Sequence, residues 1–436
     1  MKLIYRRITY SIFILIFLIA TPLILLYTSG YRYNFEKGRV QKTGILILST
    51  VPRKAEISLN GKVVENKTTP AEIKNVLPGD YEITINKEGY HPWNKKLPVY
   101  ENSTTFAEKI ILWRDDEPKI IKENSSKLWS YAPDKQQIAL VDEKNGLYIF
   151  SLNDSSLKYL GTADKNTNQI IWSQNNKKIA LANGEGKDKF FDVYELSAAD
   201  HKWQTISGYE TISWPLNGNE DFIYGLNSEG IWSVNLKNNS KQLLADREDI
   251  DDFLIDSASL YLISKKQIIR QDLNNPAKKQ AIAQTERTGY KFLREENNKL
   301  ILSDNLGNIA VIDKNNAFKP IEINAKNIEW RNSNIFLYYN DFEIAIVNLE
   351  KDKKTIITRV SRQISMAIWH DQGRDIIYSS GNNINIIEID DRELRNIVSL
   401  TDNTRADFLA TSANGKTLYF SGATDNKNGI FKLELQ

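Results

Sequence analysis

Cysteine is absent from this chain of 436 residues, and histidine is nearly absent, with three residues. Without cysteine the chain has no disulfide, no thiolate nucleophile and no cysteine-ligated metal. The histidines are not spaced as a metal-binding pair such as His-x-x-x-His; they are His91, His201 and His370. We therefore expect no metal and no resident cofactor, and we expect each histidine to be an ordinary surface or core residue.

An excess of charge of one sign is also lacking, because 57 basic side chains nearly balance 55 acidic ones. The chain as a whole has no strong field to attract nucleic acid, so we expect no nucleic-acid partner. Hydrophobic residues make up 41% of the chain, which is enough to build cores. They occur in short runs between Asn, Asp, Gly and Ser residues, a pattern that predicts an all-β fold.

One long hydrophobic run at the N-terminus departs from this pattern. Residues 1–7 form a basic leader, and the twenty residues 8–27 carry no charge. At about 1.5 Å of rise per residue, a helix of this length spans roughly 30 Å, the thickness of a bilayer core. The run therefore predicts a transmembrane anchor. The alternative is a cleaved signal peptide ending near the small residues Thr28 and Gly30, but such peptides have apolar cores of about 7 to 15 residues.

Residues 28–43 are predicted as a juxtamembrane linker. Basic side chains in this segment offset the basic leader, so the positive-inside rule does not choose an orientation; they are Arg32, Lys37, Arg39 and Lys42. Aromatic side chains resemble an interfacial belt; they are Tyr27, Tyr31, Tyr33 and Phe35. We favour a single-pass cell-membrane protein with its bulk outside the cytoplasm, because a short basic leader before one apolar segment is typical of export. A cytoplasmic bulk is the alternative.

Residues 44–113 are predicted as a small β-sandwich. The expected strands are residues 45–48, 56–59, 81–85 and 106–112. Turn sequences separate them, and Asn60-Gly61 favours a type I′ hairpin because both central residues must adopt positive φ. Tyr81, Ile83 and Ile85 alternate with other residues, which places the three on one face of a half-buried sheet.

The order of motifs in this segment resembles the PEGA domain. The matching stretches are Val51-Pro52-Arg53-Lys54-Ala55, Asn60-Gly61, Thr69-Pro70, Leu77-Pro78-Gly79-Asp80-Tyr81 and Lys87-Glu88-Gly89-Tyr90. Arg53 and Lys54 replace the acidic residue and the glycine of the tetrapeptide that names the family. The resemblance implies an envelope β-domain, often part of a membrane-anchored protein, that serves binding or packing rather than catalysis.

Two aromatic residues that follow the last of these turns are candidate binding residues. Tyr90 and Trp93 offer ring faces on which a carbohydrate could stack. The competing interpretation is that both rings close the small core of the domain, which is the more frequent role of large aromatic residues.

Residues 118–436 contain an internal repeat marked by one aromatic position. The aromatic residues are Trp129, Trp172, Trp214, Phe253, Phe292, Trp330, Trp369 and Phe408, at intervals of 38 to 43 residues. A period near 40 with several short apolar runs per unit is typical of a β-propeller. We predict eight blades, with seven as the alternative, and we expect the repeated aromatic residues to pack between blades.

Units that begin with Trp129-Ser130-Tyr131-Ala132-Pro133-Asp134 and Trp172-Ser173-Gln174 resemble the TolB-type, WD40-like propeller repeat. The resemblance implies a propeller with a protein-binding surface. The eighth unit ends at residues 430–435 without a fourth strand, while Lys119-Ile120-Ile121 is a spare strand before the first unit. We predict that these two segments pair and close the ring.

Chemistry-bearing motifs in the propeller are few. No Gly-x-Ser-x-Gly elbow is present, and Gly184-Glu185-Gly186-Lys187 is too short for a phosphate loop, so we interpret it as a hairpin tip. Asp246, Asp249 and Asp251 belong to an acidic run that lacks the spacing of a calcium loop. They are candidates for a cation or a basic partner, and the competing interpretation is a solvated loop.

These observations favour a membrane-anchored binding or scaffolding protein of the cell envelope. The propeller would present a rigid platform to a protein or to cell-wall glycan. The alternative is a glycosidase-like enzyme, which needs two carboxylates facing the central channel at about 5 to 10 Å. We expect no enzyme, and the sequence does not predict an oligomeric state.

Overall fold

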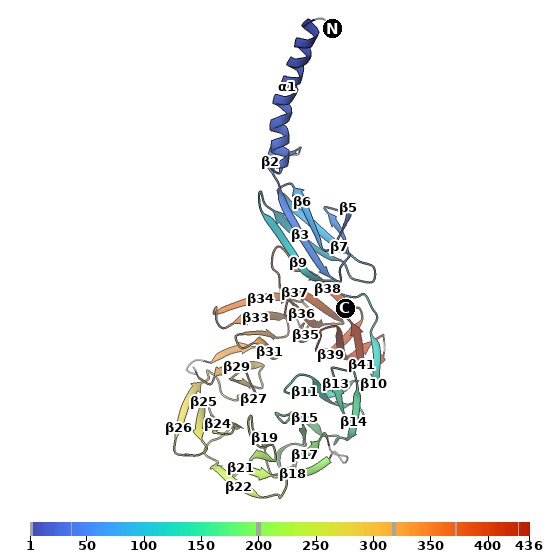
Figure 1. Cartoon of the computed structure of the whole chain (residues 1–436). Coiled ribbons are helices and arrows are strands. Elements are labelled where there is room, and N and C mark those ends of the chain that lie inside the picture. Colours follow the sequence, from blue (N-terminus) through green and yellow to red (C-terminus); the bar gives the residue numbers. More distant parts are fainter. Residues whose placement is uncertain (1–2, 36, 198–201, 316–319, 371–372, 426) are drawn as a thin grey trace. The chain divides into compact units, whose positions relative to one another are not determined.

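The computed structural model of the chain describes residues 3–35, 37–197, 202–315, 320–370, 373–425 and 427–436 (Figure 1). The chain divides into two compact units. The first comprises residues 1–116, 387–398 and 435–436, and the second comprises residues 117–386 and 399–434. The predicted propeller segment 118–436 is therefore not one continuous unit, because residues 387–398 group with the N-terminal part of the chain.

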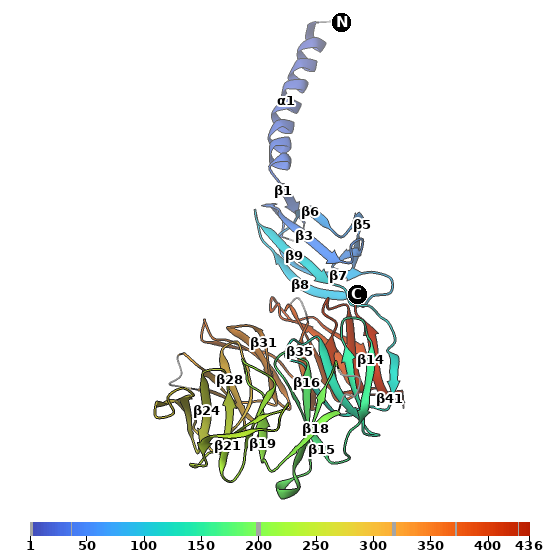
Figure 2. The same ribbon diagram turned by 60° about the horizontal axis from the view of Figure 1, so that its bottom comes forward.

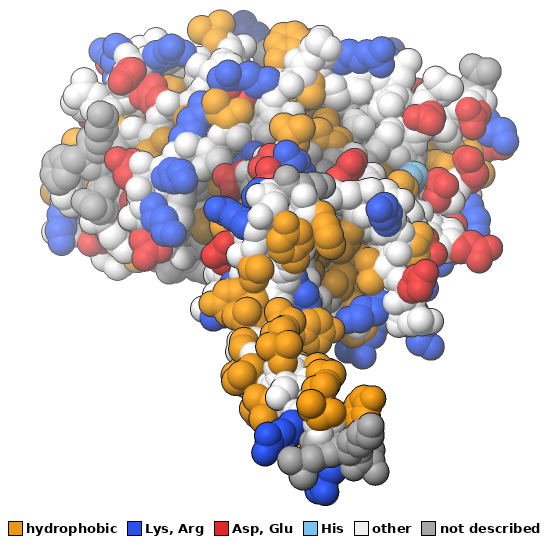
Figure 3. Space-filling model, turned by 90° about the horizontal axis from the view of Figure 1, so that it is seen from above, with side chains coloured by type: hydrophobic (Ala, Val, Ile, Leu, Met, Phe, Trp, Pro, Cys, Tyr) orange, Lys and Arg blue, Asp and Glu red, His pale blue; other side chains and the backbone are white. Residues whose placement is uncertain are grey.

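The predicted apolar run is helical. The helix α1 (Leu3–Thr28) begins at Leu3 rather than at Ile8 and runs through Pro22. An 18-residue window within Ile4–Thr28 has a mean hydropathy of 2.5 and is 0% buried, and hydrophobic side chains dominate the side of the helix seen in Figure 3. The helix is therefore long enough and apolar enough to cross a membrane.

Residues 28–43, predicted as a linker, contain a β-hairpin. Its strands are β1 (Tyr31–Asn34) and β2 (Arg39–Lys42), which form a two-stranded antiparallel sheet. Gly38 has a φ of +61°, which glycine adopts without the steric cost of a Cβ atom. The sequence analysis did not predict these strands, because each has only four residues.

The following residues form a sandwich of two sheets, as predicted. One sheet has the order β6 (Ala71–Val76), β3 (Gly44–Val51), β9 (Thr104–Ile111), and the other has the order β5 (Lys62–Thr68), β4 (Glu56–Leu59), β7 (Gly79–Asn86), β8 (Trp93–Val99). Leu46, Leu48, Ile57, Ile83 and Ile85 are fully buried in the core that the two sheets share. Strands β5, β6 and β8 were not predicted.

Lys95 is a charged residue on the buried side of β8, and its side chain is 0% exposed. Its Nζ donates to Glu388 Oε1 and, at 2.9 Å, to the backbone oxygen of Asp390, both in the segment 387–398 of the first unit. The Trp93 indole N–H also donates to Glu388, at 3.2 Å.

Burial alone would raise the pKa of Asp390, but hydrogen bonds from Arg392 and the charges of Lys95 and Arg392 lower this pKa to about 2.

Residues 119–434 form eight four-stranded sheets in the part of the chain that the structure describes, the same number as the aromatic repeats. The first three are β11 (Ser126–Tyr131), β12 (Gln137–Asp142), β13 (Gly146–Ser151), β14 (Leu157–Thr162); β15 (Thr167–Trp172), β16 (Lys178–Asn183), β17 (Phe190–Glu195), β18 (Lys202–Ser207); and β19 (Thr211–Ser213), β20 (Phe222–Leu226), β21 (Gly230–Asn235), β22 (Lys241–Asp246). A short 3₁₀ turn, Gly186–Asp188, lies between β16 and β17.

The next sheets continue the same up-and-down order. They are β23 (Asp252–Ile255), β24 (Ser259–Ser264), β25 (Gln267–Asp272), β26 (Lys279–Gln284); β27 (Lys291–Glu296), β28 (Lys299–Ser303), β29 (Asn308–Asp313), β30 (Ile321–Asn324); β31 (Asn327–Asn332), β32 (Ile335–Tyr339), β33 (Glu343–Asn348), β34 (Lys353–Arg359); and β35 (Ile364–Trp369), β36 (Asp375–Ser380), β37 (Asn383–Glu388), β38 (Ile397–Thr401). The last sheet has the order β10 (Lys119–Glu123), β41 (Lys427–Glu434), β40 (Thr417–Thr424), β39 (Thr404–Thr411).

The eight sheets follow one another around a ring in sequence order (Figure 1). First strands such as β11, β19 and β27 lie toward the centre, and last strands such as β14, β22 and β26 lie at the rim. Figure 2 shows the same sheets after rotation. This arrangement is a β-propeller, and the predicted all-β fold with a propeller and a small sandwich is confirmed.

The repeated aromatic residues lie on or directly after the innermost strands and contact the preceding sheet. The indole N–H of Trp172 donates to Ser130 O at 3.1 Å, and that of Trp369 donates to Glu329 O at 3.0 Å. Each bond satisfies a buried polar group while the ring fills space between two sheets. The predicted role of these aromatic residues in packing between blades is confirmed at these positions.

The ring closes as predicted. Strand β10 pairs antiparallel with β41, with Lys119 opposite Lys432 and Ile120 opposite Phe431. The last sheet therefore combines a strand that precedes all the other propeller strands with three strands from the C-terminal end.

Candidate functional site

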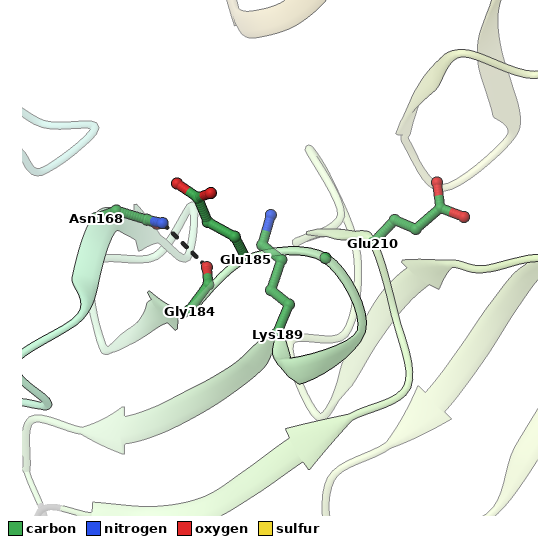
Figure 4. A pocket seen from close by; sticks show the side chains of 6 residues that line it. Asn168, Gly184, Glu185, Lys189 and Glu210 are labelled. Atoms are coloured by element: carbon green, nitrogen blue, oxygen red, sulfur yellow. Dashed lines mark hydrogen bonds between the residues drawn. The ribbon is translucent and has the colours of Figure 1, made fainter.

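A pocket of about 310 Å³ lies between loops of the second and third sheets of the propeller. Its lining residues are Asn168, Gly184, Glu185, Gly186, Lys189 and Glu210 (Figure 4). Asn168 belongs to the innermost strand β15, and Glu210 directly precedes the innermost strand β19. The pocket therefore lies near the centre of the ring, at the mouth formed by the β16–β17 loop.

Hydrogen bonds fix the turn at Gly184 that lines the pocket. Asn168 Nδ2 donates to Gly184 O at 3.1 Å, drawn in Figure 4, and Gly184 N donates to Asn166 O at 3.2 Å. Gly184 has a φ of +71°, and a Cβ there would lie 3.0 Å from Asp188 O. Glycine is therefore required at this turn, and the predicted hairpin tip is confirmed because β16 and β17 are antiparallel neighbours.

Lys189 is the positively charged group of the pocket, and in Figure 4 its side chain lies between Glu185 and Glu210. Burial lowers the pKa of Lys189, and the like charge of Lys291 adds to this shift, while Asp252 and Glu185 oppose it. Among the described residues no carboxylate lies within ion-pair distance of its ammonium group. Glu210 instead pairs with Arg247 at 3.1 Å. The pocket can therefore offer the Lys189 ammonium and the exposed Glu185 carboxylate to a ligand.

An ion pair joins two opposite sheets of the ring at its other mouth. Lys135, in the loop after β11, lies 3.2 Å from Glu296, at the end of β27. These residues come from the first and fifth sheets, which are opposite members of the ring. Glu296 also accepts from Arg294 at 3.0 Å. Because loops of an up-and-down sheet alternate between its two ends, this ion pair lies at the mouth opposite the pocket.

Glu329, on β31, is a partly buried acid near this ion pair. Its Oε2 accepts from the backbone N–H of Trp369 at 3.0 Å. Burial raises the pKa of Glu329 to about 7, although the charge of Lys135 and the hydrogen bond from Trp369 oppose the shift. Burial likewise raises the pKa of Tyr131, and the negative charge of Glu329 adds to that shift. The centre of the ring therefore contains an acid that titrates near neutral pH.

Replacing Glu329 by glutamine is expected to change how stability depends on pH. Below about pH 4.5 the parent side chain is neutral in both states, whereas between pH 4.5 and 7 the unfolded chain loses its proton first, so the parent loses stability as pH rises. We expect the variant to be about 2 kcal/mol more stable than the parent at pH 8 and equal to it at pH 4. Denaturant unfolding at both pH values measures this.

The matched control is Glu350→Gln, in an exposed loop of the same sheet. It is expected to change stability by less than about 0.5 kcal/mol at either pH. Equal effects of the two substitutions at pH 8 would contradict the raised pKa of Glu329.

Tyr90 and Trp93 do not form an exposed carbohydrate platform. Trp93 is 4% exposed and lies in the core of the sandwich, and Tyr90 packs against the same core. A sugar needs a free ring face for stacking, which the buried Trp93 ring does not offer. For Trp93 the stacking hypothesis is therefore corrected in favour of core packing.

The structure does not bring Asp246, Asp249 and Asp251 together around a cation. The carboxylate of Asp249 lies 3.0 Å from the Lys265 ammonium, and Asp251 Oδ2 accepts from Lys265 N at 2.7 Å. All three acids are exposed. Within the described ranges, no group of three or more His, Cys, Asp or Glu side chains could hold a metal ion.

The described histidines lie apart. His370 is 1% exposed, and its Nε2 lies 2.8 Å from Gly415 O, while His91 lies 3.5 Å from Asp115. His201 lies outside the described residues. Sequence reasoning missed Lys189, Glu210 and Glu329, because they are far apart along the chain and no local motif connects them.

Comparisons with known proteins support both parts of the fold. Residues 43–110 match the family model of the PEGA domain. The C-terminal WD40 domain of Sif2 is similar to the chain, with 11% identity, a TM-score of 0.50 and coverage of 72% of this chain and 98% of that one. At this identity the similarity shows the fold alone.

Two further solved structures have lower TM-scores. The computationally designed Ika8 protein has 10% identity, a TM-score of 0.48 and coverage of 72% of this chain and 96% of that chain. The RRP9 WD40 repeats have 11% identity, a TM-score of 0.41 and coverage of 73% and 98%. No match was found among curated protein sequences. The chain therefore carries a PEGA domain at residues 43–110, followed by a WD40-like β-propeller.

Proposed function

We propose that the chain is a membrane-anchored binding protein of the cell envelope, with the PEGA domain and the propeller outside the cytoplasm. The observation that carries the proposal is the pocket at one mouth of the ring, where loops of separate sheets gather Glu185, Lys189 and Glu210 around about 310 Å³. A propeller holds such loops on rigid sheets, which is the usual arrangement of a binding platform. The apolar helix α1 supports the anchor.

The partner in this proposal is another envelope protein or a cell-wall glycan. Lys189 can donate to a carboxylate or carbonyl of the partner, and the Glu185 carboxylate can accept from an amine, amide or hydroxyl. The pocket is small, so it suits one protruding side chain or one sugar of a larger partner.

The proposal treats the propeller as a binding module rather than an enzyme. Glu329 has a pKa of about 7, which suits a general acid, but it accepts a hydrogen bond from Trp369 N between the sixth and seventh sheets. The pocket acid Glu210 is engaged by Arg247. Neither arrangement presents a paired acid and base to one ligand.

Orientation is tested by single-cysteine labelling, because the chain has no cysteine of its own. We expect a membrane-impermeant maleimide to label Leu306→Cys, which is 78% exposed on the propeller, in intact bacterial cells. Tyr5→Cys, at the other end of α1, should react only after the membrane is opened. The reverse pattern would place the propeller in the cytoplasm.

Binding at the pocket is tested in the same cells with a photo-crosslinking residue at position 185. We expect a discrete adduct that is absent when the crosslinker replaces Leu243 on the outer strand β22, and that is lost when Lys189→Glu is added. Sensitivity of the adduct to a protease or to a glycan-degrading enzyme identifies the class of partner. Identical adducts at both positions, or none at position 185, would count against a partner at this mouth.

A further inference from the structure

The hairpin formed by β1 and β2 is joined rigidly to the end of α1. Thr43 donates to Gly30 O through its backbone N at 3.0 Å and through its Oγ1 at 2.8 Å. Arg32 Nη1 donates to Tyr27 O and to Tyr31 O, both at 2.8 Å. These bonds tie both ends of the hairpin to the last turn of the helix and the residues after it. These bonds therefore place the hairpin beside the end of the helix.

The two faces of the hairpin differ. Asn34 and Gln41 lie on one face, are each 4% exposed and share a hydrogen bond of 2.9 Å, and Gln41 also donates to Glu101 at 3.3 Å. The register places Tyr33 opposite Val40 on the other face, where they are 50% and 52% exposed. One face is thus packed against the following domain, while the other leaves apolar groups in contact with solvent.

The tip of the hairpin adds a further apolar group. Phe35 is 88% exposed, and its ring centroid lies 5.0 Å from that of Tyr33. Five residues of extended chain reach at most about 17 Å, so Phe35 stays within that distance of Gly30 at the helix end. An exposed aromatic pair this close to an apolar helix suits the interfacial layer of a bilayer.

The hairpin is also basic. Residues 29–43 contain four basic side chains and one acidic side chain. Among the described residues, no carboxylate lies within ion-pair distance of Lys37, Arg39 or Lys42, and Lys37 and Arg39 are exposed. Each basic residue near an anionic membrane surface contributes about 1 kcal/mol of attraction. Exposed apolar and basic side chains on the same hairpin are complementary to anionic lipid.

We propose that this hairpin binds the headgroup layer of the membrane that α1 enters. Tyr33, Phe35 and Val40 enter the interface, and the basic side chains bind the phosphate groups of anionic phospholipids. The inference rests on the proposed anchoring of α1. It also explains why the basic residues after the helix do not indicate its orientation: they belong to a folded lipid-binding element.

The test uses the full chain in lipid vesicles, with an environment-sensitive dye on Phe35→Cys. We expect a quencher attached to lipid near the headgroups to quench this dye at least about threefold more in vesicles containing anionic phospholipid than in zwitterionic vesicles. The difference should disappear at high salt and in the variant Lys37→Gln/Arg39→Gln/Lys42→Gln. The matched control is a dye on Val63→Cys, a 52% exposed position on β5, which should not be quenched.

Flotation of the vesicles separates this inference from the anchor. If the protein floats and the dye at position 35 stays unquenched, the hairpin proposal is wrong and the anchor stands. If quenching is equal in both lipid compositions, binding to anionic headgroups is wrong. If the protein does not float, the anchor fails and the hairpin proposal fails with it.

Discussion

Lys95→Met is expected to lower the free energy of unfolding of the first unit by about 2 to 4 kcal/mol, because it leaves the partly buried carboxylates of Glu388 and Asp390 without their partner. The Lys95 side chain is 0% exposed, and it contacts both Glu388 and Asp390. Removing one member of a buried ion pair costs more than the pair itself contributes. Chemical denaturation, with hydrogen exchange at residues 387–398, measures the loss.

The neighbouring lysine supplies a matched control. Lys96, on the same strand, is 55% exposed and lies 3.4 Å from the equally exposed Asp80. Lys96→Met should change stability by less than about 1 kcal/mol, since exposed ion pairs contribute little. Replacing Glu388 by glutamine and Asp390 by asparagine in the Lys95→Met chain should restore part of the lost stability. Equal effects at positions 95 and 96 would show that residues 387–398 do not pack on β8.

Gly429→Val is expected to destabilise the propeller by about 3 kcal/mol or more, because it obstructs the strand pair that closes the ring. A Cβ atom at residue 429 would lie 2.5 Å from Lys122 O and 2.9 Å from Ile120 Cδ1. The backbone of β10 cannot yield to this clash and keep its register with β41. Thermal and denaturant unfolding of the full chain measure the effect.

Asn428→Val tests the same strand without the clash, because Asn428 is exposed. It should change stability by less than about 0.5 kcal/mol. A Gly429→Val chain as stable as the parent would mean that pairing of β10 with β41 does not hold the ring closed. A proteolytic cut near β10 that appears only in Gly429→Val would support the proposed cause of the destabilisation.

The propeller could be predicted from the sequence because its signals are local and repeated. Each repeat places an aromatic residue on or beside an innermost strand. The interval between these aromatic residues is therefore the number of residues in each sheet and its loops. The closing pair could also be predicted, since one unit lacks a strand at the C-terminal end and an unused strand precedes the first unit. Counting strands along the chain was enough to connect residues 119–121 with residues 430–435.

The candidate site could not be predicted in the same way. Glu185, Lys189 and Glu210 are ordinary charged residues in loops, and only the packing of the second sheet against the third brings them to one mouth. Lys135 and Glu296 meet across the ring although neither belongs to a motif. Such pairs depend on three-dimensional position rather than on local pattern.

Lys95 is an intermediate case. Trp93, Leu97 and Val99 are buried on one side of β8, and Lys95 has the same parity along the strand. The alternation of apolar and polar residues in β8 therefore indicated that the Lys95 side chain points inward. A lysine at an apolar position, however, weakens the prediction of a strand. Its acidic partners could not be found from the sequence, because they lie almost three hundred residues further along the chain.

The pairing of β10 with β41 can form only late in the synthesis of the chain. Strand β10 is synthesised before every other propeller strand, and its partner is the last strand of the ring. It has no partner in its own sheet until β39, β40 and β41 have been synthesised. Ring closure therefore joins two segments that lie far apart in the sequence, and forming such contacts slows folding. Until β41 has been synthesised, the propeller remains an open arc with a free edge.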